Sequence, residues 1–575
     1  MTVVATIAVW APRAGRVEAI VGGVRHALKP SGDWWGADLV LAHGTDYAFS
    51  LDGEEPLPDP RSAWQPAGVQ GASRYVDHDR FDWRVRHWPG KPITGLVGYE
   101  LHIGTFTPGG TFDAAIERLD ALVELGVDFV EVMPVAAFPG RNGWGYDGVF
   151  PYAVQDSYGG PDGFKRFVDA CHSRGLGVLL DVVYNHLGPD GNVLPHYGPY
   201  FTDSYATPWG SAVNFSGPDS DDVRRYFLDN ALMWLRDYHL DGMRLDAVHA
   251  IIDTSATHLL EQLAIEVAAL SNEIGRPLTI VAESDLNDPR IVSPREVGGY
   301  GVDAQWSDDF HHALHAALTG ETFGYYEDFG GLADVATALN HGYVYVGQHS
   351  GHRRRQHGRP LPSSVRSQQL FGYSQNHDQV GNRARGERLC HLVSPGLAKI
   401  AAAIVLLSPF TPMLFMGEEW AASTPWQYFT EHDDPELVES IRAGRRNEFK
   451  SFGWRPEQVP DPQDPQTSKR STLDWSERER EPHREMLDWY RALIRLRQES
   501  GELRDGGFEQ AAAEVDEKSR VLVMKRADTT VVANLSPQQR RVDVPASRVL
   551  LASSSDIVLE GQLTMPGESV AVLGR

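Results

Sequence analysis

An alternation of short apolar runs and amphipathic stretches between residues 95 and 420 constrains the fold of this chain more than any other feature. Eight runs are apolar on both faces, as is typical of strands in a parallel sheet that helices cover. The segments between most of them show the helical period, and several end in glycine. Eight strand–helix units predict a closed (β/α)8 TIM barrel. The eight runs are residues 95–106, 127–135, 176–186, 241–251, 278–284, 302–310, 369–378 and 412–420.

The two ends of the chain follow a different pattern. Short alternating runs separated by Gly, Pro and Asp fill residues 1–88 and return in residues 501–575, and this spacing is typical of small β-sandwiches. We therefore predict an α/β protein whose barrel, residues 89–500, lies between an N-terminal, carbohydrate-binding-like β-sandwich and a C-terminal β-sandwich. Two segments, 187–220 and 421–480, show no periodicity and contain several aromatic residues, so we expect inserted functional loops there.

The composition excludes several classes of protein. The formal net charge of −25 disfavours a polyanionic partner such as nucleic acid. The two cysteines, Cys171 and Cys390, are too few for a disulfide scaffold or a cysteine-based metal cluster. The first residues lack the basic start and long apolar core of a secretory signal, and no run of about 18 apolar residues could span a membrane. We expect a cytoplasmic protein without a membrane partner.

Polar and charged residues stand at the ends of several predicted strands. In (β/α)8 barrels the active site lies at the carboxyl ends of the strands, whereas charged groups inside a buried strand are rare unless they are paired or functional. The sequence therefore predicts a site at this end of the barrel. The strand-end residues are Asp181, Asn185, His186, Arg244, Asp246, His249, Glu283, His377 and Asp378.

Three of these carboxylates, Asp246, Glu283 and Asp378, suit hydrolysis of a glycosidic bond, which uses one ionised and one protonated carboxyl group. Arg244 lies two residues before Asp246, so it points to the same side of the strand and would keep Asp246 ionised. Glu283 follows an apolar run, and burial there would raise its pKa, as an acid requires. A buried ion-pair network that only stabilises the barrel remains an alternative.

A metal site is a second alternative for the same strand ends. Asp181, Asn185, His186 and His249 include possible ligands, but no compact spacing such as H-E-x-x-H is present. We expect neither a metal nor another cofactor.

Four segments together resemble the signature regions of the α-amylase family of glycoside hydrolases: DVVYNH, GMRLDAVHA, VAESD and YSQNHDQVGN. They occur in the order of that family, each at a predicted strand end. The resemblance implies that Asp246 is the nucleophile, Glu283 the acid and base, and Asp378 the stabiliser of the transition state. It also implies substrate contacts for Tyr146, His186, Arg244 and His377.

Further segments resemble those family members that cut the α-1,4 bond next to the terminal trehalose of maltooligosyl trehalose. These segments are residues 59–77, 206–215, 305–321 and 377–389, and the resemblance covers nearly the whole chain. It implies α-glucans as substrates and, as a pathway partner, the maltooligosyltrehalose synthase that makes the substrate. Together with the strand-end position of His249, it suggests further substrate contacts at His249, Asp308, Asp309, His311, His312, Gln379, Asn382 and, on the long loop, Trp209.

Other functions remain open from the sequence. A glycogen branching enzyme, which is an α-1,4-glucan transferase, and an isoamylase-type debranching enzyme would use the same three carboxylates. A non-catalytic carbohydrate-binding protein on the same scaffold would typically lack one of them, and all three are present. The basic segment 351–360 suits a solvated loop at least as well as a sugar-binding one.

Overall fold

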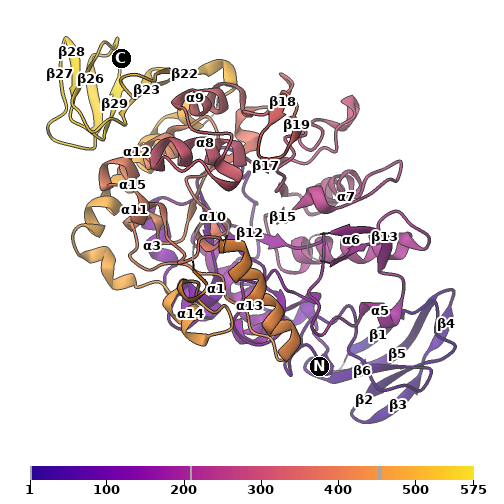
Figure 1. Cartoon of the computed structure of the whole chain (residues 1–575). Coiled ribbons are helices and arrows are strands. Elements are labelled where there is room, and N and C mark those ends of the chain that lie inside the picture. The colour runs from indigo at the N-terminus through magenta and orange to yellow at the C-terminus, as the bar shows by residue number, and fades with distance from the viewer. Residues whose placement is uncertain (1–2, 208–209, 451–454, 505) are drawn as a thin grey trace.

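The computed structural model describes residues 3–207, 210–450, 455–504 and 506–575. Its centre is a closed barrel of eight parallel strands (Figure 1), which confirms the predicted fold class. In chain order the strands are β8 (Gly98–Leu101), β9 (Phe129–Val132), β12 (Gly177–Val182), β15 (Gly242–Leu245), β16 (Thr279–Ala282), β17 (Ala304–Trp306), β20 (Leu370–Gly372) and β21 (Thr411–Phe415).

The period-two alternation of the strands separates two apolar cores. Phe129, Leu179 and Val281 point into the barrel, where they pack with Trp306, Phe371 and Met413 in one buried cluster. Their strand neighbours, such as Val130, Leu180 and Ile280, belong to the larger core under the helices. Residues two positions further along each strand point inward again, one layer higher. The barrel core therefore forms the floor on which strand-end side chains stand.

Helices cover the barrel between most strands, and glycine ends several of them. In α3 (Leu119–Leu125) the chain leaves the helix at Gly126, which has a φ of 97°, as the sequence predicts. Between β16 and β17 the fully described segment contains only a 3-10 turn, η4 (Arg295–Val297). The main covering helices are α4 (Gly160–Ser173), α6 (Ser220–Asp237), α7 (Leu259–Ile274), α8 (Asp308–Thr319), α12 (Pro395–Leu407) and α15 (His483–Glu499).

Two groups of β-strands flank the barrel at opposite ends of the molecule (Figure 1). The N-terminal group forms two sheets. One has the order β1 (Val3–Trp10), β5 (Trp34–Leu41), β4 (Lys29–Ser31), and the other β3 (Val24–Ala27), β2 (Val17–Val21), β6 (Asp46–Leu51), β7 (Ser73–Arg74). It contacts α6 through the indole of Trp34, which donates to Asp222 at 2.8 Å. The C-terminal group forms a five-stranded and a three-stranded sheet between Ala511 and Gly574. The domain limits at residues 88 and 500 remain a prediction.

The two segments predicted as loops contain more regular structure than expected. Residues 187–220 hold α5 (Leu194–Tyr197) and an antiparallel hairpin of β13 (Phe201–Thr207) and β14 (Gly210–Val213). Residues 421–480 hold α13 (Pro435–Lys450) and α14 (Pro465–Arg470). The prediction of α13 failed because few of its residues are apolar and most lie in solvent. Its start was readable, since Asp434 precedes Pro435 and its side chain accepts from the amide of Glu436.

The basic segment 351–360 is also ordered, because it connects and completes a hairpin of β18 (Val346–Ser350) and β19 (Arg355–Gly358). In the described part of the chain, no helix is both long and apolar enough to cross a membrane.

Overpacking the barrel floor should destabilise the protein. A Cβ atom at Gly98 would lie 2.3 Å from the ring of Phe129, so Gly98→Ala should cost about 1–3 kcal/mol of folding free energy and lower the unfolding temperature measured by calorimetry. Gly444→Ala, in exposed helix α13 where a Cβ meets no neighbour, is the matched control and should be neutral or slightly stabilising. Equal effects of both substitutions would contradict this packing.

Candidate functional site

One arginine holds the centre of the site together. The side chain of Arg244, on β15, is fully buried and its guanidinium contacts three carboxylates from neighbouring strand ends. Nη1 lies 2.6 Å from Asp181 and 3.1 Å from Asp246, and Nη2 lies 2.7 Å from Glu283. The central carbon of its guanidinium, Cζ, lies 4.3 Å from the ring centroid of Trp306, a residue of the barrel core. The structure thus brings Arg244, Asp246 and Glu283 together as the sequence predicts.

Asp246 is held as an anion. Burial alone would raise its pKa, but the charge of Arg244, the imidazole of His186 and a hydrogen bond from Asn185 outweigh burial and hold the pKa below its usual value. The amide of Asn185 donates to Oδ2 at 2.7 Å. The side chain remains 12% exposed at the open end of the barrel, so an ionised oxygen is accessible there.

Glu283 has the opposite character. Burial raises its pKa well above the usual value; Arg244 lowers it, while the negative charges of Asp246 and Asp378 raise it further. The backbone amide of Ala247 donates to Oε2 at 2.8 Å. Two carboxyl groups on one guanidinium therefore differ in protonation, the pattern that separates an acid from an anion in a catalytic pair.

Asp378 reaches the site from α10 (His377–Gly381), which follows β20. The side chain of Asn376 caps this helix by accepting from the amide of Asp378 at 2.8 Å. Asn382 donates to Oδ1 of Asp378 at 3.3 Å, whereas the side chain of Gln379 accepts from the amide of Asn376 and serves the cap. The Asp378 side chain is 39% exposed, the most open of the three carboxylates.

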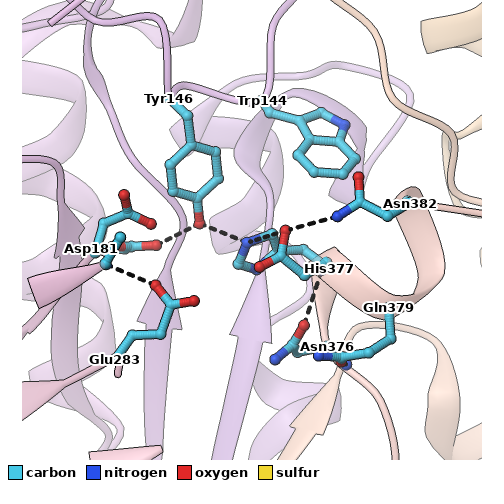
Figure 2. Close-up of polar contacts among 12 residues, drawn as sticks. Trp144, Tyr146, Asp181, Glu283, Asn376, His377, Gln379 and Asn382 are labelled. Atoms are coloured by element: carbon cyan, nitrogen blue, oxygen red, sulfur yellow. Dashed lines mark hydrogen bonds and ion pairs between the residues drawn. The ribbon is translucent and has the colours of Figure 1, made fainter. Parts of the chain in front are cut away.

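A chain of hydrogen bonds runs from Glu100 to Arg244. Figure 2 shows its middle part, from His377 through Tyr146 to Asp181. Nδ1 of His377 lies 2.5 Å from Glu100, and Nε2 lies 2.8 Å from the hydroxyl of Tyr146. That hydroxyl donates to Asp181 at 2.5 Å, so Nε2 of His377 must donate to it, and both ring nitrogens carry protons. Burial lowers the pKa of His377, but Glu100 and Asp378 raise it to about 9. His377 is therefore a cation at neutral pH.

The glycine-broken loop before β11 (Phe150–Val154) presents Tyr146. Gly145 has a φ of 102°, and a Cβ there would lie 2.2 Å from the carbonyl oxygen of Pro134, so only glycine fits. The carbonyl of Tyr146 contacts Nε2 of His186 at 3.1 Å, while Nδ1 contacts Asn185 at 2.5 Å. Trp144, from the same loop, lies close to Tyr146 and His377 (Figure 2).

The predicted contacts on α8 are divided between two places. Asp308 is partly exposed and accepts from Tyr373 at 2.5 Å; burial raises its pKa to about 7. Asp309 is buried, and its Oδ2 accepts from Asn287 and from the amides of Val344 and Tyr345. The structure thus aims Asp309 at the chain that leads to β18.

The two histidines of α8 also differ. His311 is fully buried, and its Nε2 lies 2.9 Å from the hydroxyl of Tyr326. His312 is 9% exposed, with its ring stacked on Tyr325 at 5.0 Å. Burial lowers the pKa values of both, so they are neutral at physiological pH. His249 lies beside Asp285, with Nδ1 3.9 Å from the carboxylate, and Trp209 lies outside the described residues.

Sequence reasoning missed several residues of the site. Glu100 pairs with His377, and Glu131, its register partner on β9, is buried with no hydrogen-bond partner for either oxygen. Both were readable as charges within apolar strands. A small cavity of about 150 Å³ beside Asn382 is lined in part by Phe323, Tyr325, Arg383 and Phe449. Arg383 lies in the segment 377–389 and Phe449 in the expected loop 421–480, but Phe323 and Tyr325 belong to no segment that the sequence analysis singled out, and only the folded chain brings these residues together.

The arrangement supplies an accessible carboxylate, a protonated carboxyl group and a further carboxylate at one barrel mouth. Among the residues that the structure describes, no cluster of three or more His, Cys, Asp or Glu is arranged to hold a metal ion.

This chain is similar in sequence to known families and proteins. Residues 72–197 match the family "Alpha amylase, catalytic domain", and residues 506–572 match a domain of unknown function, DUF3459. The chain is 56% identical to a malto-oligosyltrehalose trehalohydrolase of Arthrobacter ramosus, covering 85% of this chain and 86% of the relative. It is 50% identical to that of Rhizobium sp. (strain M-11), covering 98% and 97%.

A crystal structure described as a putative alpha amylase from Salmonella typhimurium matches with a TM-score of 0.91 at 37% identity, covering 99% of this chain and 97% of that one. A 1,4-alpha-glucan branching enzyme of Vibrio cholerae is 34% identical, over only 48% of this chain and 43% of the relative.

Removing the counterion of His377 should reverse its protonation state. Because the charge of Glu100 raises the pKa of His377, Glu100→Gln should lower that pKa from about 9 toward or below neutrality. NMR of protein labelled with ¹³C in its histidines would follow the titration, and calorimetry would report the destabilisation expected when one partner of a buried pair is lost. Glu117→Gln, at an exposed position, is the control. An unchanged titration would show that other groups hold the proton.

Proposed function

Since this chain belongs to the malto-oligosyltrehalose trehalohydrolases of the α-amylase family, we propose that it hydrolyses the α-1,4-glucosidic bond next to the terminal trehalose of maltooligosyl trehalose. The products are trehalose and a maltooligosaccharide. The observation that supports the chemistry most directly is the Arg244 guanidinium shared by Asp246 and Glu283, whose pKa values shift in opposite directions.

The proposed first step forms a covalent glycosyl-enzyme. The Asp246 carboxylate attacks the anomeric carbon, while Glu283 donates its proton to the glycosidic oxygen and the carbon–oxygen bond breaks. One guanidinium contacts both carboxyl groups, so they lie close together. This closeness suits the separation of roughly 5 Å in retaining enzymes better than the ~6.5–9.5 Å of inverting ones.

In the proposed second step, the Glu283 carboxylate takes a proton from water, and the water oxygen attacks the anomeric carbon and releases Asp246. Asp378, open to the barrel mouth, stabilises the positive charge on the sugar in both steps. His377 and His186 remain proposed contacts of the sugar, and to bind a hydroxyl each would have to share a ring nitrogen that now bonds within the protein. The partly exposed ring of Tyr146 offers an apolar face.

We place the trehalose unit beyond Glu283, near α8 and the cavity beside Asn382. Phe323 and Tyr325 there are 47% and 37% exposed, and exposed aromatic rings suit the apolar faces of sugars. Trehalose joins two glucose units head to head, so it bends differently from maltose. A site shaped for that bend rejects a linear glucan by leaving polar groups unpaired. Trp209 and the α8 residues Asp308 and His312 remain proposed contacts on this side.

The proposed pathway partner is the maltooligosyltrehalose synthase that makes the substrate, and the proposed location is the cytoplasm, where two free cysteines suit a reducing environment.

Product analysis tests the proposed function. Incubation with maltopentaosyl-trehalose should release free trehalose, detected by chromatography, because the cut lies next to that unit. Asp246→Ala should reduce turnover by several orders of magnitude, as nucleophile deletions do, in a variant that still folds but unfolds at a lower temperature, because the buried Arg244 loses a counterion. A new α-1,6 branch in the product would instead identify a transferase. An Asp246→Ala variant that kept a tenth of the activity would refute the assigned nucleophile.

The role of Glu283 gives a second test. Glu283→Gln should abolish hydrolysis of natural substrates, yet release the aryl group of an aryl α-maltoside in a first turnover, because a good leaving group needs no proton. Since the raised pKa of Glu283 keeps its proton to higher pH, the limb of wild-type kcat/KM that falls with rising pH should lie above the range of an ordinary glutamic acid, and this limb should vanish in the aryl burst of the variant. Equal losses on both substrates would point to a structural carboxylate.

A further inference from the structure

The basic hairpin β18–β19 is bound to the site by Asp285. This residue follows Glu283 by two positions, and its Oδ2 lies 2.8 Å from Nη1 of Arg353, in the hairpin turn. Its carbonyl contacts Nε2 of His357 on β19 at 2.8 Å. On the other side, its Oδ1 lies 3.9 Å from Nδ1 of His249, which follows β15. Asp285 therefore joins three segments that are distant in the sequence.

A second carboxylate fixes the same hairpin from behind. Asp328 accepts from the hydroxyls of Ser350 and Tyr345, at 2.5 and 2.7 Å, and from the amide of Gly351 at 2.8 Å. The turn of the hairpin is thus held by Asp285 and Asp328 on opposite sides. These contacts fix the position of the Arg353 side chain, which lies in this turn.

The side chains of the cluster are partly exposed, although Nε of Arg353 and Nδ1 of His249 are themselves buried. The side chains of Asp285 and Arg353 are 32% and 19% exposed, and that of His249 is 26% exposed. Nε of Arg353 and Nδ1 of His249 have no hydrogen-bond partner. Burial would raise the pKa of Asp285, but His249 and Arg353 hold it below the usual value, so the carboxylate is ionised.

The position of this cluster relative to Glu283 decides which part of the substrate it can contact. Tyr146, His186 and His377 lie on the side of the site formed by β8, β9 and β12 and by the loop after β20. Asp285 follows β16, the strand that ends in Glu283, and the neighbouring β17 leads to Asp308. The negative charges of Asp285 and Asp378 both raise the pKa of Asp308. The cluster therefore lies beyond Glu283, where the leaving group departs.

We propose that Asp285 and Arg353 are specificity-determining residues that bind hydroxyl groups of the leaving disaccharide. This inference rests on the proposed function. A carboxylate and a guanidinium held 2.8 Å apart offer acceptors and donors together, a combination that matches neighbouring hydroxyls of one sugar ring. A sugar whose hydroxyls point in other directions would leave Asp285 and Arg353 without these hydrogen bonds. Sites of this kind bind the matching sugar much more tightly than the mismatched one.

The test compares Arg353→Gln with Arg355→Gln, an exposed arginine of the same hairpin whose replacement changes the charge equally. Substrates are maltopentaosyl-trehalose, maltoheptaose and an aryl α-maltoside, whose leaving group is no sugar. We expect Arg353→Gln to lower kcat/KM for maltopentaosyl-trehalose at least tenfold more than for the aryl substrate, and to weaken product inhibition by trehalose by a similar factor. Arg355→Gln should change neither quantity.

Two outcomes would overturn the proposal: equal losses on all three substrates, which would show a structural role, or no selective loss with maltopentaosyl-trehalose. Asp285→Asn, alone and combined with Arg353→Gln, should give losses that do not add, because the two side chains act as one unit. If instead the proposed function is wrong, the wild type will release no trehalose. The ratio of kcat/KM for maltoheptaose to that for the aryl substrate, compared between wild type and Arg353→Gln, would then still show whether Arg353 contacts the leaving group.

Discussion

The buried guanidinium of Arg244 is the interaction on which the site depends. It stands where alternating barrel-floor residues give way to strand-end polar residues, and it contacts carboxylates from β12, β16 and its own strand. An isolated charge at this depth would be very unfavourable. Three carboxyl groups compensate it, and because burial raises the pKa values of Asp181 and Glu283, the one that stays most acidic is Asp246. Because Arg244 lowers the pKa of all three, the difference between them comes from their other surroundings, such as His186 and Asn185 beside Asp246.

A second cation, His377, balances the opposite side of the barrel mouth. Its partner Glu100 lies beside Glu131 in the register of β8 and β9, and burial together with the charges of Glu100 and Asp181 raises the pKa of Glu131 well above its usual value. A neutral Glu131 leaves the single anion Glu100 to pair with His377. The hydroxyl of Tyr146 then joins this pair to Asp181 and Arg244, so that the two cations are coupled through one hydrogen-bonded chain.

The sequence was sufficient for the barrel and its three carboxylates because both follow from local patterns. Short runs that are apolar on both faces mark the strands, and polar residues just beyond such runs lie at the mouth of the barrel. Contacts that join distant segments were not readable. Asp309 looks like a mouth residue in sequence, yet its hydrogen bonds go to Asn287 and to the chain before β18. Likewise, α13 has too few apolar residues for its period to stand out.

This contrast explains why chemistry and selectivity are built from different parts of the chain. The groups proposed to act on the anomeric carbon lie at ends of strands or of the short helix α10, where the barrel fixes them. The groups beyond Glu283 come from segments inserted between strands, such as the hairpin β18–β19, and they are positioned by a few ion pairs and caps. Such a segment can change its side chains without disturbing Arg244. The leaving-group side can therefore be specialised for one disaccharide while the arrangement of the carboxylates stays the same.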